Sequence, residues 1–275
     1  MSAPAAQERG PRWLLLIGLP IGFVSSLCGI GGGLFASSFL HFVLGMDLKR
    51  ATGTGLVLVL ATTGAATLTE SFQPGGGSAI HWGVTACLVL GVWIGAKLGF
   101  VISERVSERL LRGIFAVVLL LSAAKMLLGG ASAETLVESG FEPSWPQALW
   151  ALLIGVGGGC ASPVLGVGGG LVMVPGLFLG LPGFGFDAAR ACSLAAGVVG
   201  SSRSLVLKHK AGRVSMSHGL WLAGGSLVGA SLGVLSLGIH EGLLNYGRQG
   251  IGILLGLVGL RFVRELCSPK AAAGQ

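Results

Sequence analysis

Long, continuous apolar stretches dominate this sequence and constrain its fold more than any other feature. The eight stretches are Trp13–Gly45, Ala51–Thr69, Trp82–Ile102, Leu110–Leu128, Gln147–Leu181, Ala188–Leu207, Gly219–Ile239 and Tyr246–Val263. They are too long and too uniformly apolar for the alternating strands of roughly ten residues that build membrane β-barrels. Only 11% of the residues are charged, whereas soluble domains average about 25%. We therefore expect an all-α polytopic membrane protein.

The formal net charge of +7 does not indicate a nucleic-acid partner. The basic residues are scattered between the apolar stretches rather than gathered on one face, and membrane proteins collect Lys and Arg in their cytoplasmic loops. The five cysteines are an odd number without CxxC spacing, so neither a disulfide framework nor a zinc site is indicated. We expect no cofactor and no bound metal.

Three short motifs occur twice in the same order, which indicates a duplicated unit. The pairs are GIGGGL at 29–34 with GVGGGL at 166–171, Asp47–Ala51 with Asp187–Ala191, and Gly95–Gly99 with Gly229–Gly233. The second pair places Cys192-Ser193 at the positions of Thr52-Gly53. The predicted organisation is a tail at 1–12, a first repeat at 13–129, an acidic linker at 130–146, a second repeat at 147–266 and a tail at 267–275.

The leading apolar region of each repeat is interrupted by the glycines and either crosses the membrane once or folds back as a hairpin. With single crossings, eight basic residues fall inside and seven outside, which is no bias. With hairpins, only Arg190 and Arg248 remain outside and thirteen lie inside. The thirteen are Arg9, Arg12, Lys49, Arg50, Arg105, Arg109, Arg112, Lys208, Lys210, Arg213, Arg261, Arg264 and Lys270. The positive-inside rule therefore favours hairpins.

A hairpin and three full crossings in each repeat make the two repeats face opposite ways across the membrane. This inverted topology is typical of secondary transporters, whose substrate site lies near the midplane between the repeats. Both chain termini and the basic loops would then be cytoplasmic, and the acidic linker would lie outside the cell.

The glycines are expected to break each leading helix and expose backbone amides to a substrate. Half-helices would begin at Leu34 and Leu171, and the first N–H groups of a helix have no internal partner and carry partial positive charge. Gly31–Gly33 and Gly168–Gly170 have no side chains, so an anion could reach these amides without a fixed cation. The alternative is that the glycines only permit close helix crossing, as in GxxxG motifs.

Several polar residues within the spans could complete the anion site. The candidates are Ser37, Thr52, Thr54, Ser193 and Arg203. Hydroxyl groups can donate to oxyanion oxygens, although most membrane Ser and Thr bond to their own helix backbone. Arg203 lies about one turn from the cytoplasmic end of its span, so snorkelling to the surface competes with a substrate role.

Acidic residues are scarce within the spans. Asp47 and Asp187 are the only aspartates and are expected to cap span ends, and Glu70 is the one glutamate that approaches a span, at its outer end. Proton- and sodium-coupled carriers usually need a carboxylate inside the membrane. We therefore expect transport without a dedicated proton relay, because a cell interior that is electrically negative already drives anions outward.

A membrane enzyme and an anion channel are the competing functional classes. The sequence has no pair of aspartates within the spans, and its GxSxG spacing at Gly229–Gly233 lies inside an apolar stretch rather than at a strand-to-helix turn, so we expect no enzyme activity. Thiol chemistry at Cys28, Cys160 or Cys192, near the glycine breaks, is harder to exclude, although buried Cys usually serves as small apolar filler. A channel is distinguished from a carrier by its flux.

These motifs resemble the TauE/SafE (TSUP) family of sulfite exporters over roughly residues 13–265. The segments that carry the resemblance are GIGGG after the first span, RATGTGL at 50–56, GVGGGLVMVP at 166–175, RACSLAAG at 190–197 and HKAGRV at 209–214. The resemblance implies a multi-pass protein of the bacterial cytoplasmic membrane that transports sulfite, organosulfonates or related organic anions.

We accordingly expect efflux of a small anion, with the lipid bilayer as the other partner and a homo-oligomer left open. An anion channel, or an uptake carrier for a sulfur compound such as thiosulfate that uses a cysteine near the site, remains the alternative. Family resemblance does not identify which anion is carried.

Overall fold

The computed structural model describes residues 12–72, 79–105 and 143–237, with isolated helical residues between 116 and 124 and between 250 and 264. The last expected span of each repeat, most of the linker and both tails therefore lie outside the described residues. Every regular element of the described part is a helix. The expected all-α membrane architecture is confirmed.

Each repeat contributes four described helices. They are α1 (Leu14–Cys28), α2 (Gly33–Phe42), α3 (Leu48–Ser71), α4 (Trp82–Arg105), α6 (Trp145–Leu165), α7 (Gly170–Gly180), α8 (Phe186–Lys210) and α9 (Met216–Leu237). The half-helices α2 and α7 begin one residue before the expected Leu34 and Leu171. Helix α6 begins inside the expected linker, because Ser144 and Gln147 form a capping box there.

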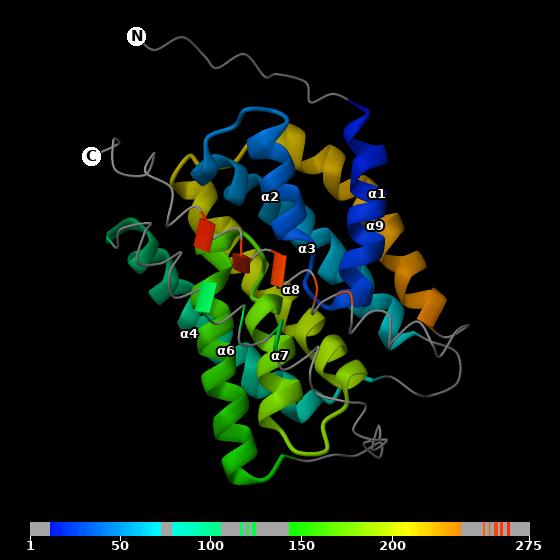
Figure 1. Ribbon diagram of the computed structural model, residues 1–275, viewed down its shortest axis with the longest axis vertical. Helices are drawn as coiled ribbons and strands as arrows, with labels where there is room; N and C mark the ends of the chain where they lie inside the picture. Colours follow the sequence, from blue (N-terminus) through cyan, green and yellow to red (C-terminus); the bar gives the residue numbers. More distant parts are fainter. Residues whose placement is uncertain are drawn as a thin grey trace.

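The leading region of each repeat folds as a hairpin, and the two hairpins point in opposite directions. Helix α2 returns to the end of the molecule at which α1 begins, and α7 returns to the opposite end, at which α6 begins (Figure 1). Helices α3 and α8 likewise run in opposite directions (Figure 1). The expected hairpins and the inverted relation of the two repeats are confirmed.

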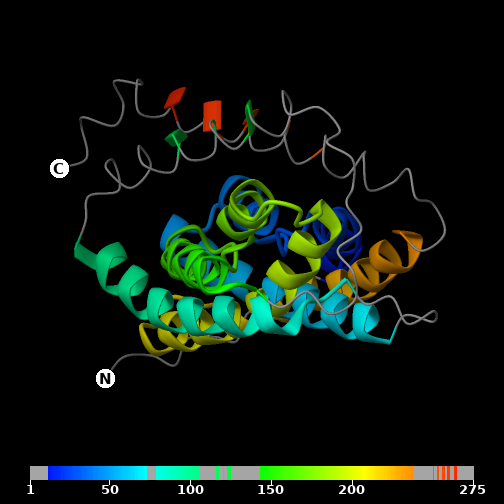
Figure 2. The same ribbon diagram turned by 90° about the horizontal axis from the view of Figure 1, so that it is seen from below.

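The repeats exchange their helices, so that α1 packs on α9 and α6 packs on α4. Glycines at four-residue intervals make these contacts close, because a Cβ on Gly95 would overlap the carbonyl oxygen of Val156, and one on Gly229 would overlap that of Leu19. Seen from below, the two hairpins lie together on one side of α3 and α4 (Figure 2). Tight helix crossing therefore explains these glycines, while the hairpin glycines have another role.

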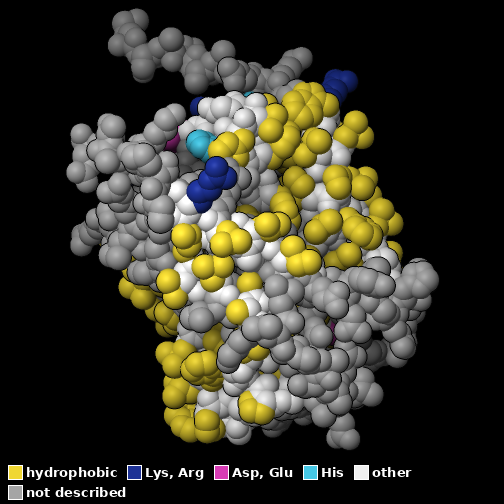
Figure 3. Space-filling model, in the orientation of Figure 1, with side chains coloured by type: hydrophobic (Ala, Val, Ile, Leu, Met, Phe, Trp, Pro, Cys, Tyr) yellow, Lys and Arg dark blue, Asp and Glu magenta, His cyan; other side chains and the backbone are white. Residues whose placement is uncertain are grey.

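Apolar side chains cover much of the described surface, as expected for contact with lipid (Figure 3). Four described helices are long and apolar enough to cross a membrane, and they are α3, α4, α6 and α9. Helix α8 is as long but less apolar, because it lies inside the bundle against α3, α4 and α7. A helix in this position faces protein rather than lipid and can carry charged groups.

Candidate functional site

The two hairpin tips are built from glycines in a left-handed conformation. Gly29 and Gly166 end α1 and α6 with φ of 71° and 70°, and their N–H groups donate to Ser25 O and Ser162 O. Left-handed backbone is strained for residues with a Cβ, which explains the choice of glycine. The following residues with positive φ are Gly31 (76°), Gly32 (81°), Gly168 (73°) and Gly169 (95°). The glycines therefore break the helices, as expected.

The two tips contact each other inside the molecule. A Cβ on Gly33 would overlap the carbonyl oxygen of Gly166, and a Cβ on Gly170 would lie 2.5 Å from that of Gly29. Both tips lie near the middle of the long axis (Figure 1). The first residue of each half-helix therefore sits against the break of the other repeat.

Each half-helix presents its first amides at this junction. The backbone bond from Ala36 N to Gly32 O, of 3.1 Å, closes the first turn of α2, and Met173 N to Gly169 O does the same for α7. The N-cap residues Gly32 and Gly169 make no side-chain capping bond. The amides that precede these bonds have the partial positive charge that binds anions at helix N-termini.

The predicted hydroxyl residues lie around the junction but bond to the protein. Ser37 Oγ donates to Gly33 O, and Ser193 Oγ donates to Gly29 O at 3.2 Å. Thr52 Oγ1 donates to Lys49 O at 3.0 Å. Thr54 Oγ1 accepts a bond of 2.9 Å from Ser215 N. These hydroxyls hold the breaks and their neighbouring helices in position, and direct contact with substrate stays a prediction for each.

Arg203, the predicted cation of the site, stacks on an aromatic ring, and its contact with substrate stays a prediction. Its guanidinium carbon stacks on the ring of Trp93 in α4, 3.7 Å from the ring centroid. Trp93 is exposed on the lipid-facing surface. This cation–π contact at the edge of the bundle fits the snorkelling alternative better than a substrate role.

The structure aligns α3 with α8 in a register that differs by two residues from the alignment of the Asp47–Ala51 and Asp187–Ala191 motifs. Gly29 and Gly166 are equivalent caps, and a Cβ on Gly29 would lie 3.0 Å from Arg190 Cα, whereas one on Gly166 would lie 2.9 Å from Thr52 Cα. Thr52, not Arg50, is therefore the counterpart of Arg190. The same shift makes Thr54 the counterpart of Cys192, and it corrects the expected pairing of Cys192-Ser193 with Thr52-Gly53.

A second observation supports this register. Thr54 Oγ1 accepts a bond from Ser215 N just before α9, and Cys192 Sγ accepts one of 3.3 Å from His81 N just before α4. The hydroxyl and the thiol thus play the same part in the two repeats. The Cys192 thiol has a structural role here, as expected of a buried cysteine.

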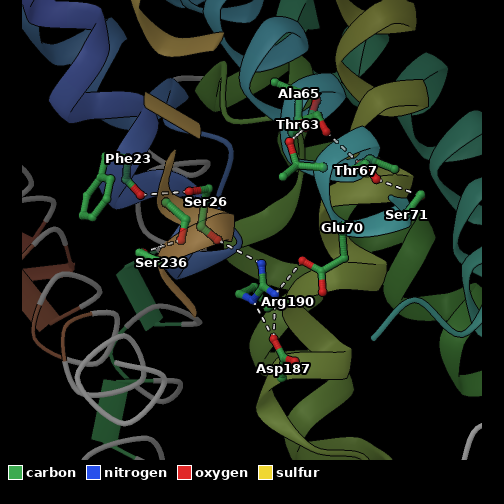
Figure 4. A network of polar contacts seen from close by, with 12 residues as sticks. Phe23, Ser26, Thr63, Ala65, Thr67, Glu70, Ser71, Asp187, Arg190 and Ser236 are labelled. Carbon is green, nitrogen blue, oxygen red and sulfur yellow. Dashed lines mark hydrogen bonds and ion pairs between the residues drawn. The ribbon is translucent and has the colours of Figure 1, made fainter. Parts of the chain in front are cut away.

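A buried cation lies against the first break, contrary to the expectation of a site without one. Arg190 is 1% exposed, and its Nη1 donates to Ser26 O at 3.3 Å. Its Nε and Nη2 donate to Asp187 Oδ1 at 2.9 and 2.6 Å, and Nη2 also donates to Glu70 Oε2 at 2.9 Å (Figure 4). Arg190 therefore belongs to the interior and is not a loop residue at the outer surface.

Glu70 also differs from expectation, because it is 3% exposed at the end of α3. The spans thus contain a buried carboxylate, and its partner Arg190 comes from the other repeat. In the structural register the counterpart of Glu70 is Lys208, which is equally buried at 3%. No local motif indicates this pair, because the two residues are far apart in the chain.

Ser25 is a further residue of the junction that the motifs did not reveal. Its side chain is fully buried next to the first break, 2.6 Å from the place where a Cβ on Gly32 would lie. Within the described part of the chain its Oγ has no hydrogen-bond partner. The only sequence signal is its position just before the glycines.

Comparison with known proteins agrees with this architecture. The family described as "Sulfite exporter TauE/SafE" matches residues 2–126 and 151–274, one block in each repeat. No solved structure gives a significant match.

Curated relatives carry transporter names. The chain is 31% identical over 126 residues to "Probable membrane transporter protein MamO" of Magnetospirillum gryphiswaldense, covering 44% of this chain and 20% of that protein. It is 24% identical over 193 residues to a "Probable membrane transporter protein" of Methanocaldococcus jannaschii, covering 68% and 67%. It is 26% identical over 118 residues to "Probable membrane transporter protein YunE" of Bacillus subtilis, covering 42% and 41%.

The match spans only about a fifth of the MamO protein, so the activity of that whole protein does not transfer. The family match, in contrast, extends over both repeats of this chain and includes both glycine breaks. The chain belongs to the sulfite exporter TauE/SafE family of membrane transporters.

Proposed function

We propose that this protein is a carrier that exports a small oxyanion, sulfite or an organosulfonate, across the bacterial cytoplasmic membrane. The observation that carries the proposal is the contact between the two glycine breaks, where Gly33 and Gly170 begin half-helices of opposite repeats. Helix N-termini attract anions through their free amides and dipole. Inverted repeats that meet at such a site support alternating access.

The distribution of charge supports an orientation with both chain termini in the cytoplasm. The Lys and Arg side chains visible in Figure 3 lie in its upper part, at the end where α1 and α3 begin and α8 ends. The described residues there include Arg12, Lys49, Lys210 and Arg213. Because cytoplasmic loops carry the excess of basic residues, we assign this end to the cytoplasm.

The direction follows from the membrane potential. A cell negative inside favours exit of each negative charge by about 2.3 kcal/mol per 100 mV. An anion carrier without a coupling ion would therefore export its substrate. The buried Glu70 removes the argument that the spans have no carboxylate, so proton coupling through Glu70 is the second candidate.

Transport by purified protein in liposomes tests these alternatives. The vesicles would be loaded with sulfite, thiosulfate, sulfoacetate or sulfate, and a potassium diffusion potential would set the voltage. We expect saturable, voltage-dependent flux of sulfite or sulfoacetate that shows counter-flow. Flux that needs a proton gradient and ignores voltage would overturn the electrogenic proposal, and flux far above carrier turnover would indicate a channel.

A further inference from the structure

Two serines occupy equivalent places at the ends of the first hairpin helices. Ser25 O accepts the capping N–H of Gly29, and Ser162 O accepts that of Gly166. Both side chains are fully buried. The repeats thus place one hydroxyl beside each glycine break, and the surroundings of the two hydroxyls can be compared directly.

The second hydroxyl is engaged within the protein. Ser162 Oγ donates to Gly200 O at 3.4 Å and accepts a bond of 2.9 Å from Ser204 Oγ. In the structural register, the counterpart of Ser204 on α3 is Ala66, which has no hydroxyl to offer. Among the described residues, Ser25 Oγ is left without a partner.

The surroundings of the two half-helix N-termini can be compared in the same way. Ser25 Oγ lies 2.6 Å from the Cβ position of Gly32, the N-cap of α2. The same position also meets Leu58 Cδ2 at 3.0 Å and Ile21 Cγ2 at 3.1 Å. At α7, a Cβ on Gly169 would meet Gly158 O at 2.7 Å and Met173 Cε at 2.8 Å. The counterpart of Met173 in α2 is Ala36, which bears only a methyl group. Apolar groups therefore lie against both N-termini, and the difference between the two is the unpaired hydroxyl at the first.

We infer that the anion is bound at the N-terminus of α2 alone, where Ser25 donates a hydrogen bond to it. A buried hydroxyl without a partner is unfavourable, and an oxyanion oxygen beside the amides of α2 would satisfy it. At the N-terminus of α7 the equivalent hydroxyl, Ser162, is already bonded to Gly200 O and Ser204 Oγ, and this N-terminus serves to position the first break. This inference rests on the proposed function and narrows its site from two half-helices to one.

The chemistry of the groups beside the first break defines the class of ligand. All the groups named here are donors, namely the Ser25 hydroxyl and the first amides of α2, so the ligand must present several acceptor oxygens on a compact head. The sulfonate or sulfite group meets this requirement. Gly32 has no Cβ, which allows the Ser25 hydroxyl to lie close to the backbone at the start of α2.

The decisive experiment compares Ser25→Ala with Ser162→Ala in proteoliposomes that export sulfite and sulfoacetate. We expect Ser25→Ala to raise KM about tenfold or more at similar maximal flux, because a hydrogen bond to a charged ligand is lost. The matched control Ser162→Ala should change KM less than about twofold, since its hydroxyl bonds only to the protein.

Thermal unfolding in detergent separates failure of this inference from failure of the proposed function. Anions that bind the folded protein raise the midpoint temperature of its thermal unfolding. We expect sulfite or sulfoacetate to raise this midpoint for the wild type and Ser162→Ala but not for Ser25→Ala. Equal effects of the two serine substitutions on KM and stabilisation would overturn the single-site inference alone. A wild type that neither binds nor exports these anions would overturn the proposed function as well.

Discussion

Arg190 and Glu70 form a buried ion pair that joins α8 of the second repeat to α3 of the first. Arg190 Nη2 lies 2.9 Å from Glu70 Oε2, and the two side chains are 1% and 4% exposed. Asp187, which is 39% exposed, provides a second carboxylate at 2.6 Å. Among the described residues, this ion pair connects the two repeats. It lies against the first glycine break (Figure 4).

Removal of Glu70 should destabilise the protein strongly. Glu70→Ala leaves the buried guanidinium with the partly exposed Asp187 as its one described carboxylate partner, and breaking a buried pair typically costs about 3–5 kcal/mol. We expect the midpoint of thermal unfolding in detergent to fall markedly. Asp187→Asn should have a smaller effect, because solvent reaches that carboxylate.

The double substitution Glu70→Met with Arg190→Met is the control for this pair. It removes both charges, so no unpaired ion remains, and it should recover much of the stability lost by Glu70→Ala. An unfolding midpoint for Glu70→Ala equal to that of the wild type would show that the pair does not hold the repeats together.

Gly33 should not tolerate a methyl group, although glycine is otherwise a poor helix former. A Cβ at this position would overlap the carbonyl oxygen of Gly166 across the junction, and such overpacking costs about 1–3 kcal/mol. Gly33→Ala should therefore lower the unfolding midpoint and abolish flux in liposomes. Gly64 in α3 has open space within 4 Å, so Gly64→Ala should be neutral or stabilising by up to about 1 kcal/mol. Normal flux from Gly33→Ala would contradict the observed contact of the tips.

The hairpins could be predicted from the sequence because their determinants are local. Left-handed turns require glycine, and the glycines occur twice at the heads of two apolar regions, so both the breaks and the inverted relation followed from motif and charge counting. The register of the repeats could not be predicted from the sequence, because the matching Arg-Ala pairs at 50–51 and 190–191 are not structural counterparts. Contact with Gly166 identifies Thr52 as the residue equivalent to Arg190.

The buried polar groups could not be predicted for a different reason. Glu70 and Arg190 look like residues at span ends when each is judged by its own neighbours in the chain, and only the packing of α8 against α3 buries them together. Ser25 lacks the partner that Ser204 provides to Ser162, because Ala66 stands at the equivalent place on α3. Such differences depend on which helices meet, which a single sequence does not state.

The exchanged helix pairs should respond equally to the same change in each repeat. A Cβ on Gly95 would overlap Val156 O in α6, and one on Gly229 would overlap Leu19 O in α1. We expect Gly95→Ala and Gly229→Ala to lower the unfolding midpoint by similar amounts, since close backbone approach stabilises both pairs. Gly157→Ala is the control, because its Cβ would meet only Val172 Cγ1 at 3.6 Å. A large effect at one glycine and none at the other would argue against equivalent pairs.

Transport should follow voltage rather than the proton gradient. Methanesulfonate is a suitable probe, because this organosulfonate stays singly charged near neutral pH and its own protonation cannot mimic coupling. For one charge, 100 mV corresponds to about 2.3 kcal/mol, so electrogenic movement should drive the concentration ratio toward roughly fiftyfold at equilibrium. The measurement is the steady-state distribution of the anion across vesicles at several imposed potentials and equal pH.

Glu70→Gln distinguishes a structural carboxylate from a coupling carboxylate. The amide oxygen can still accept a hydrogen bond from Arg190, while the side chain can no longer take up or release a proton. If Glu70 only joins the repeats, the variant should show lower stability but the same voltage dependence as the wild type. A wild type whose anion distribution follows an imposed pH gradient, together with a Glu70→Gln variant that has lost this response, would instead establish Glu70 as the proton site and replace electrogenic export with proton-coupled transport.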